Sequence, residues 1–375
     1  MEQQGIRKTY QYKLKPTPEQ AHMLERTLML CRHVYNAAIG ERREAWQKCG
    51  VSVSYYQQKA ELPSIKEAMP EYSEVNSQVL QDVVLRVERA FQAFLRRVKA
   101  DERPSYPRFH GRNRYASFTY PQVGEHGGAR LDNGFLVLSK IGRIAVRWSR
   151  PLEGTPKTVT IRREADGWYM SISCADAPIH PLPSTGQETG IDLGLEAFAT
   201  LSNGTRIFHP GWYRKAEHVL KTAQRRVSRR KQGSNRRGKA VKLLAKAHQK
   251  VRRQRLDFHH KTALRLVRES DTIYHEELQT SNMVRNHHLA KSISDAGWAA
   301  FLTILSFKAV WAGRRVMAVN PAYTSQTCSG CGVMVHKGLS VRWHSCTECG
   351  TSLHRDHNAA KNIERAGQAR RGGVA

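Results

Sequence analysis

Acidic residues are scarce in this sequence. Its 375 residues include 61 Lys and Arg but only 32 Asp and Glu, so the formal net charge is +29. The interval between Glu217 and Asp257 contains fifteen Lys or Arg and no acidic residue. Like charges repel each other within a folded chain, so an excess of this size indicates a polyanionic partner, either a nucleic acid or an acidic membrane.

The sequence also lacks a long apolar run. The longest, Ala296 to Phe307, is interrupted by Thr303 and Ser306, and it is too short to span a bilayer. The first sixteen residues contain no apolar core of the kind that signal peptides carry. We therefore expect a cytoplasmic protein whose partner is a nucleic acid and not a membrane.

Cysteines are few and unevenly placed. Three of the seven, Cys31, Cys49 and Cys174, are scattered, and an odd count argues against a disulfide framework. The other four form two Cys-x-x-Cys-Gly units separated by fourteen residues. This spacing predicts a tetrahedral zinc site, with two unrelated cysteine pairs as the alternative. The predicted zinc ligands are Cys328, Cys331, Cys346 and Cys349. Four sulfurs fill the zinc shell, so the nearby histidines are expected at the surface or on phosphates: His336, His344 and His354.

Strand and helix patterns divide the first 180 residues. Tyr10 to Leu14 alternates like a short strand, and Thr17-Pro18-Glu19-Gln20 begins a helix with a capping box that extends to about Lys48. After Pro104, turn signals at Asp132-Asn133-Gly134 and Asp166-Gly167 separate alternating runs, which indicates an antiparallel sheet or small barrel. The early strand can join that sheet, which makes the helical segment an insertion. A second helix is predicted from an apolar stripe formed by Leu80, Val84, Val87, Phe91, Leu95 and Val98.

Beyond a Pro-, Ser- and Gly-rich linker at 178–186, predicted strands alternate with helices, which is typical of an α/β core. A strand pattern begins at Gly190. Further elements are predicted at Thr272–Leu278 (strand), Ile293–Gly313 (apolar helix), Arg315–Val319 (strand) and Asn358–Ala366 (short helix).

Two basic helical runs lie between the first two of these strands. Gly233-Ser234-Asn235 separates them into a hairpin, and an apolar stripe is expected at Leu220, Val227, Leu243, Leu244, Val251 and Leu256. Solvated charged helices usually mix both signs, because opposite charges four residues apart support them. We therefore expect nucleic-acid contact over a merely solvated surface. The candidate contacts are Arg225, Arg226, Arg229, Arg230, Lys231, Arg236, Arg237, Arg252, Arg253 and Arg255.

Three carboxylates stand in unusual contexts. Asp192 lies inside an apolar strand, Glu276 and Glu277 end another, and Asp356 precedes the last helix. Each alone has an ordinary explanation, namely a turn, an exposed strand end and a helix N-cap. Hydrolysis of a phosphodiester, however, needs activated water and charge neutralisation, which carboxylate-bound divalent ions supply.

The order of these motifs resembles that of the TnpB (OrfB) proteins of bacterial insertion sequences, over nearly the whole chain. The C-terminal segments that carry the resemblance are Gly190–Leu195, Glu276–Leu278, Asn282-Met283, Leu289–Ile293, the two cysteine pairs and Arg355–Ile363. Arg32–Asn36, Tyr106–Phe109 and Gly111-Arg112 fit the same family in the N-terminal half. TnpB proteins are RNA-guided DNA endonucleases, related to the ancestors of type V CRISPR effectors.

The resemblance implies a fold of α/β class plus a β-barrel. A RuvC-like (RNase H-like) nuclease domain is expected over 187–321 and 351–375, with a zinc ribbon inserted at 322–350. A wedge-type barrel is expected over 1–16 and 101–180, with a helical recognition module inserted at 17–100.

The resemblance also implies the chemistry. Asp192, Glu276 and Asp356 would bind two magnesium ions and hydrolyse target double-stranded DNA, with a guide RNA as partner and one structural zinc ion. Glu276 is preferred over Glu277 by family position. The family often has Asp where this chain has His354, but that position is not the ligand. The alternatives are an RNA-guided DNA-binding protein that does not cut and a transposase that joins strands. A prokaryotic, nucleoid-associated protein is expected.

Some aromatic residues are candidates for stacking on bases, although about half should pack in the core. They are Tyr10, Tyr55, Tyr56, Tyr115, Phe118 and Tyr120.

Overall fold

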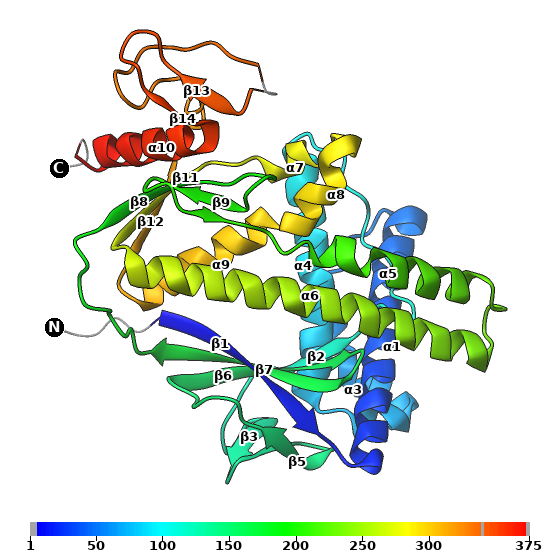
Figure 1. Cartoon of the computed structure of the whole chain (residues 1–375). Helices are drawn as coiled ribbons and strands as arrows, with labels where there is room; N and C mark the ends of the chain where they lie inside the picture. Colours follow the sequence, from blue (N-terminus) through cyan, green and yellow to red (C-terminus); the bar gives the residue numbers. More distant parts are fainter. Residues whose placement is uncertain (1–5, 339–340, 373–375) are drawn as a thin grey trace. The chain divides into compact units, whose positions relative to one another are not determined.

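The chain forms two compact units, Met1–Pro178 and Ile179–Ala375, each with its own buried core (Figure 1). The computed structural model describes residues 6–338 and 341–372.

The first unit contains a seven-stranded antiparallel sheet. Its strands, in the order β2-β6-β7-β1-β5-β4-β3, place the early strand between β7 and β5, so the predicted insertion of the helical segment into the sheet's sequence is confirmed. Both predicted turns join neighbouring strands. No ladder joins β2 to β3 among the described residues, so the sheet is not a closed barrel there. The strands are β1 (Ile6–Lys15), β2 (Ser117–Tyr120), β3 (Ala129–Asp132), β4 (Phe135–Leu138), β5 (Gly142–Arg147), β6 (Thr155–Glu164) and β7 (Gly167–Ala177).

Helices complete this unit. Thr17 and Gln20 form the predicted capping box at the start of the first helix, and Gly50 ends it. The predicted stripe of the long fourth helix is wrong at Leu95 and Val98, which are 52% and 48% exposed. Buried residues of this helix end at Val87, because its last turns extend beyond the core. The helices are α1 (Pro18–Cys49), α2 (Tyr55–Ala60), α3 (Leu62–Ala68), the short 3-10 helix η1 (Pro70–Glu74) and α4 (Ser77–Lys99).

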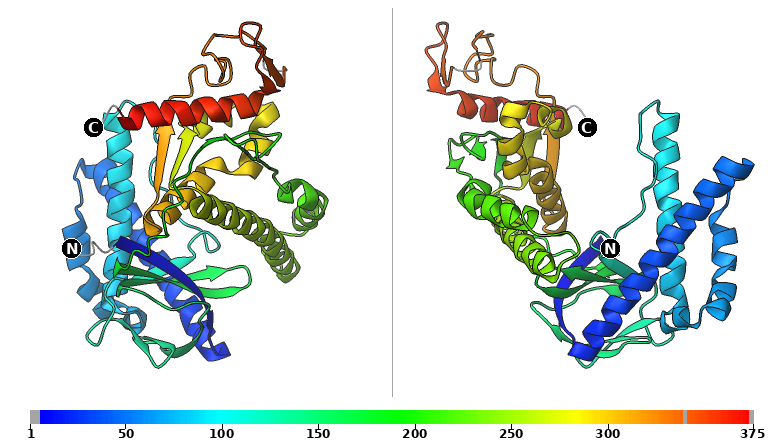
Figure 2. Two further views of the ribbon diagram at one scale, coloured as in Figure 1. Left: turned by 60° about the vertical axis from the view of Figure 1, so that its left-hand side comes forward. Right: turned by 90° about the vertical axis from the view of Figure 1, so that its right-hand side faces the viewer.

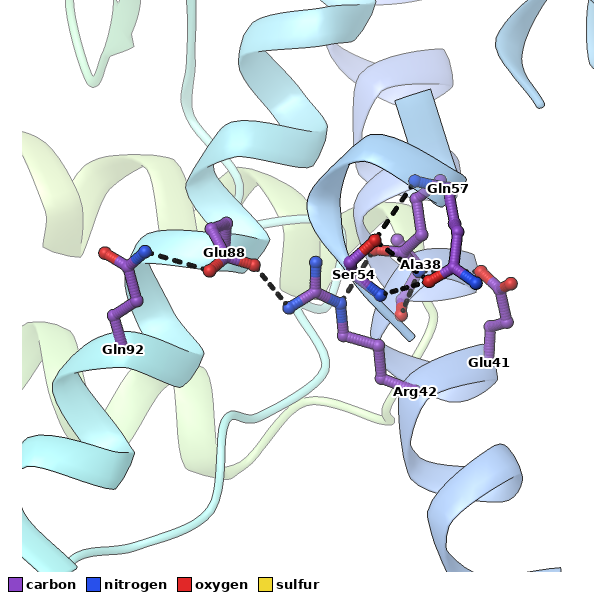
Figure 3. Close-up of polar contacts among 8 residues, drawn as sticks. Ala38, Glu41, Arg42, Ser54, Gln57, Glu88 and Gln92 are labelled. Atoms are coloured by element: carbon purple, nitrogen blue, oxygen red, sulfur yellow. Dashed lines mark hydrogen bonds and ion pairs between the residues drawn. The ribbon is translucent and has the colours of Figure 1, made fainter. Parts of the chain in front are cut away.

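A buried polar network ties α1, α2 and α4 together (Figure 3). The Arg42 guanidinium is 7% exposed; it donates from Nε to Gln58 Oε1 (2.8 Å) and from Nη1 to Glu88 Oε2 (2.7 Å). Gln58 donates in turn to the Ala38 carbonyl (2.9 Å). Buried charges are tolerated when they are paired in this way. The network therefore fixes how the three helices pack.

The second unit is the predicted α/β arrangement. Its sheet has the order β10-β9-β8-β11-β12, in which β8, β11 and β12 are parallel. Ile273 packs in one hydrophobic cluster with helices α6 (Asn235–Glu269) and α9 (Trp298–Trp311). The next residue, Tyr274, packs with α10 (Arg355–Gly372). Alternate side chains of a strand point to opposite faces, so helices cover both faces of the sheet (Figures 1 and 2). The strands are β8 (Glu188–Asp192), β9 (Ala199–Leu201), β10 (Arg206–Ile207), β11 (Thr272–Glu276) and β12 (Arg315–Val319).

The helices of this unit differ from expectation at three places. The apolar helix is two helices, because Gly297 (φ 66°) ends one and begins the next. The last helix is longer than predicted. The basic hairpin is confirmed, but Leu243 and Leu256 of its expected stripe are exposed. The helices are α5 (Trp212–Ser228), α6 (Asn235–Glu269), α7 (Thr280–Met283), α8 (His287–Ala296), α9 (Trp298–Trp311) and α10 (Arg355–Gly372).

One stretch among the described residues, His287–Trp311, has the length and composition of a membrane span. By itself this is weak evidence, because core helices have the same composition. Phe301, Leu305 and Ala309 from this stretch lie in the second unit's core.

Candidate active site

Two of the three predicted acids lie at the ends of neighbouring strands. Asp192 is the last residue of β8 and Glu276 the last of β11. These strands are parallel, and His275 pairs with Ile191, so the next residue of each strand reaches the same edge of the sheet. The carboxyl ends of parallel strands are where α/β proteins assemble their sites. Chain topology therefore brings together two acids that are far apart in sequence.

Asp356 comes from the first turn of α10, which lies directly on the sheet. A side chain at Gly190 would place its Cβ 2.1 Å from the Ala360 carbonyl oxygen, so only glycine permits this approach. A Cβ at Gly194 would lie 3.8 Å from Asp356 Oδ2. The Asp356 carboxylate therefore faces the loop that follows Asp192.

The Asp192 carboxyl lies close enough to Glu276 and Asp356 to be affected by their charges. Burial, followed by the charges of Glu276 and Asp356, raises the pKa of Asp192 to about 8, although Arg355 and Arg342 oppose the shift. Burial also raises the pKa of Glu276, against the opposing effects of the Thr324 hydroxyl and Arg355. Clustered carboxylates with raised pKa values are typical of functional sites and of sites that bind cations.

The structure distinguishes Glu276 from its neighbour. Glu276 is partly buried and accepts a hydrogen bond from the Thr324 hydroxyl, whereas Glu277 is exposed. The Glu277 backbone N–H donates to the Val319 carbonyl (3.0 Å), which continues the pairing of β11 with β12. The Glu276 charge helps to raise the pKa of the Asp192 carboxyl.

Glu196 was not singled out from the sequence. One ligand atom each from Glu196, His354 and Asp356 lie within 4.8 Å of one another. Glu196 pairs with Arg206 (2.6 Å), and His354 Nδ1 accepts the Asp356 backbone N–H (3.2 Å). The only available signal was that Glu196 follows Gly194 by two residues, in the loop after the first strand. His354 is thus partly buried beside the carboxylates and not an isolated surface residue.

The four predicted zinc ligands form a second cluster. All four sulfurs lie within 4.8 Å of one another, with 3.6 Å between Cys328 and Cys349 and between Cys331 and Cys346. Zinc–sulfur bonds of about 2.3 Å put the corners of a regular tetrahedron about 3.8 Å apart, so the cluster matches that geometry. Hydrogen bonds from the hydroxyl and the backbone N–H of Thr351 lower the pKa of the Cys349 thiol to about 6.

The prediction for His344 is wrong. It is fully buried as the central residue of β13 (Trp343–Ser345), which pairs with β14 (Ser352–His354), and its Nδ1 contacts the Lys337 ammonium. A three-residue strand turns its middle side chain to one face, and here that face is the inner one. His336 is exposed as expected.

Two of the ten candidate contacts on the basic hairpin are partly buried and bind other parts of the protein. Arg237 donates from Nη1 to the Val227 and Arg230 carbonyls (3.0 Å each), and so closes the end of α5. Arg255 pairs with the buried Asp295 (3.0 Å) of α8. These two therefore have structural partners within the protein. The other eight candidates are exposed: Arg225, Arg226, Arg229, Arg230, Lys231, Arg236, Arg252 and Arg253.

Most of the candidate stacking aromatics pack in the first unit's core. Tyr56 is exposed and Tyr55 is partly buried. The buried ones are Tyr10, Tyr115, Phe118 and Tyr120.

Three family models match the chain. One described as "Probable transposase" matches residues 171–287, one described as "Cas12f1-like, TNB domain" matches 298–363, and one described as "Helix-turn-helix domain" matches 1–50. Within the last range the structure describes a strand, β1, and a single helix, α1.

Two curated relatives match over almost the full length. A Streptomyces pristinaespiralis protein named "Putative RNA-guided DNA endonuclease" is 38% identical, covering 98% of this chain and 90% of its own. InsQ of Escherichia coli K12, with the same description, is 31% identical over 96% of this chain and 92% of its own. An Acanthamoeba polyphaga mimivirus protein named "TnpB-like protein L79" is 29% identical over 58% of this chain and 45% of its own. The chain belongs to this TnpB (OrfB) family, and the resemblance seen in the sequence is confirmed.

A solved structure shares the fold. The protein in a cryo-EM structure of a Cas12f1–sgRNA–target DNA complex superposes with a TM-score of 0.61 at 14% identity, covering 93% of this chain and 83% of that one.

Proposed function

We propose that this chain is an RNA-guided DNA endonuclease of a prokaryotic transposable element, with Asp192, Glu276 and Asp356 as its catalytic residues. The convergence of these three acids carries the proposal, since each comes from a separate stretch of a strongly basic chain. The parallel strands β8, β11 and β12 under α10 support a RuvC-like nuclease domain over 187–321 and 351–375. The names of the full-length relatives support RNA guidance.

Magnesium suits the carboxylate cluster. Magnesium prefers oxygen ligands, and the three carboxylates repel one another when no cation is bound. Asp192, Glu276 and Asp356 would hold two magnesium ions, which supply an activated water and neutralise charge on the reacting phosphate. Thr324 holds the Glu276 carboxylate in place through its hydrogen bond. His354 positions the start of α10 by accepting the Asp356 N–H.

Zinc suits the cysteine cluster. Sulfur separations of 3.6 Å and two buried thiols, Cys328 and Cys346, support one tetrahedral structural ion in a ribbon over 322–350. The segment has no hydrophobic cluster of its own among the described residues, so the ion would supply its folding energy.

A guide RNA and target double-stranded DNA are the proposed partners. The eight exposed basic residues of the hairpin support backbone contact. In the first unit, the sheet (1–16 and 101–180) corresponds to a wedge-type domain and the helices (17–100) to a recognition module. Such a protein would work in the cytoplasm, associated with the nucleoid.

The test is to purify the protein from its host, sequence the bound RNA and offer a plasmid carrying the matching target. We expect cleavage with magnesium and none without it. Absence of bound RNA would contradict guidance and favour the strand-joining transposase. Guided binding without cleavage would favour the non-cutting alternative.

A further inference from the structure

Tyr323 combines two unfavourable properties. Its backbone has φ 61°, in the left-handed region, and its side chain is 63% exposed. A non-glycine residue held there is strained, and such strain persists at functional sites. An exposed aromatic ring gains little from folding, so neither property is explained by stability.

The loop around Tyr323 is held firmly in this conformation. The Tyr323 carbonyl accepts backbone N–H groups from Gln326 and Thr327 (2.9 Å each). The next residue, Thr324, is buried, and its carbonyl accepts a hydrogen bond from Asn362 Nδ2 of α10 (2.8 Å). The helix that carries Asp356 therefore also fixes this loop.

Tyr323 adjoins the carboxylate site. The Thr324 hydroxyl donates to Glu276 Oε1, and consecutive Cα atoms are about 3.8 Å apart. An exposed ring is thus anchored one residue from the side chain that holds a proposed metal ligand.

We propose that Tyr323 is a substrate-contacting residue that stacks on the nucleotide base next to the scissile phosphate. The proposal rests on the proposed endonuclease function and deepens it. Every base presents a flat face to an aromatic ring, so stacking aligns a strand without reading its sequence. This suits a guided nuclease, because base pairing with the RNA selects the target and the cutting site must accept any sequence.

Three variants at Tyr323 distinguish the effect of losing the aromatic ring from the effect of relieving the backbone strain. Tyr323→Phe keeps the ring, Tyr323→Ala removes it, and Tyr323→Gly removes it while relieving the positive φ. Tyr323→Gly should therefore melt no lower than wild type, so its loss of function cannot come from unfolding. Phe307→Ala removes an exposed ring of α9 in the same unit and is the control.

The assay uses the guide-loaded full-length protein on a target whose cut position has been mapped. We expect Tyr323→Phe and Phe307→Ala to cut within about two-fold of wild type, and Tyr323→Ala and Tyr323→Gly about ten-fold more slowly, in line with the 1–3 kcal/mol typical of base stacking. An abasic nucleotide beside the cut should lower the cleavage rate of wild type about ten-fold. It should hardly lower the rate of Tyr323→Gly any further. In magnesium-free buffer, 2-aminopurine at that position should be quenched by wild type and not by Tyr323→Gly.

Normal cleavage by Tyr323→Gly would overturn the proposal, as would an equal abasic penalty in both proteins or equal quenching. None of these results would affect the endonuclease assignment, which fails only if wild type does not cut.

Discussion

At the scale of single residues, Asp192 shows how the site opposes folding. Burial and the neighbouring acids raise the pKa of its carboxyl to about 8. The native chain therefore retains a proton that the unfolded chain has released. The resulting stability is present below the unfolded pKa, about 3.9, and is lost as pH rises to about 8.

We therefore predict that Asp192→Asn stabilises the magnesium-free protein at pH 8, because a neutral amide avoids the cost of burying a charge and is not repelled by Glu276 and Asp356. The free energy of unfolding should rise by about 1 kcal/mol or more, since one pKa unit corresponds to ~1.4 kcal/mol. Thermal melts from pH 5 to 9, with zinc retained, check this. The wild type should lose stability more steeply over that interval. A variant that melts no higher than wild type at pH 8 would contradict the proposed repulsion.

Zinc binding is also decided by single residues. We predict that Cys346→Ser loses zinc and unfolds the ribbon segment, because one thiolate of four is removed. Cys49→Ser, at an exposed cysteine outside the cluster, is the matched control and should keep one zinc per chain. Metal analysis of both purified variants gives the answer, and equal zinc content would rule out the four-sulfur site.

At the scale of elements, the buried network around Arg42 determines helix packing. Glu88→Ala leaves the Arg42 charge buried without its carboxylate partner, and we expect a loss of about 3–5 kcal/mol in unfolding free energy. Glu74→Ala breaks the exposed pair with Arg26 and should cost far less, because solvent screens the two charges. Urea denaturation of the two variants compares them. Similar costs would mean that burial does not strengthen the Arg42 pair.

The sequence predicted elements well where the signal is local. The Thr17 capping box, the Asp132-Asn133-Gly134 turn and the strand that begins at Thr272 depend on neighbouring residues alone. The sequence-based predictions were wrong where tertiary packing determines whether a side chain is buried. Leu95 and Val98 continue a helical stripe past the end of the core, and His344 is buried by the cysteine hairpin. Periodicity describes one element and contains no information about where its neighbour ends.

The same limit applies to the site. Asp192, Glu276 and Asp356 were selected by a family resemblance, and their mutual approach depends on strand order and on the glycine contact beneath α10. Nothing local to Glu276 and Glu277 distinguishes them, whereas the sheet register does. The sequence did not identify Glu196 and Tyr323, because only the folded structure places them beside residues of the carboxylate site.

At the scale of the whole molecule, the net charge of +29 should make the affinity for nucleic acid depend strongly on salt concentration. We predict that Arg229→Gln with Arg230→Gln lowers the slope of the log of the nucleic-acid binding constant against log salt by about 1.4–1.8, because each phosphate contact contributes ~0.7–0.9. Lys261→Gln with Arg265→Gln, on the same hairpin, is the control. Those two residues already pair with Asp257 and Glu269, so the slope should hardly change. Equal changes of the salt slope in the two double variants would show that Arg229 and Arg230 make no specific phosphate contacts.

The central claim, that three carboxylates of the second unit cut DNA, is tested most directly by guided plasmid cleavage in magnesium with Glu276→Ala beside Glu277→Ala. The two acids are adjacent, but only Glu276 lies with Asp192. We predict that Glu276→Ala binds the guided target and does not cut it, while Glu277→Ala cuts like wild type. Normal cutting by Glu276→Ala would contradict the account.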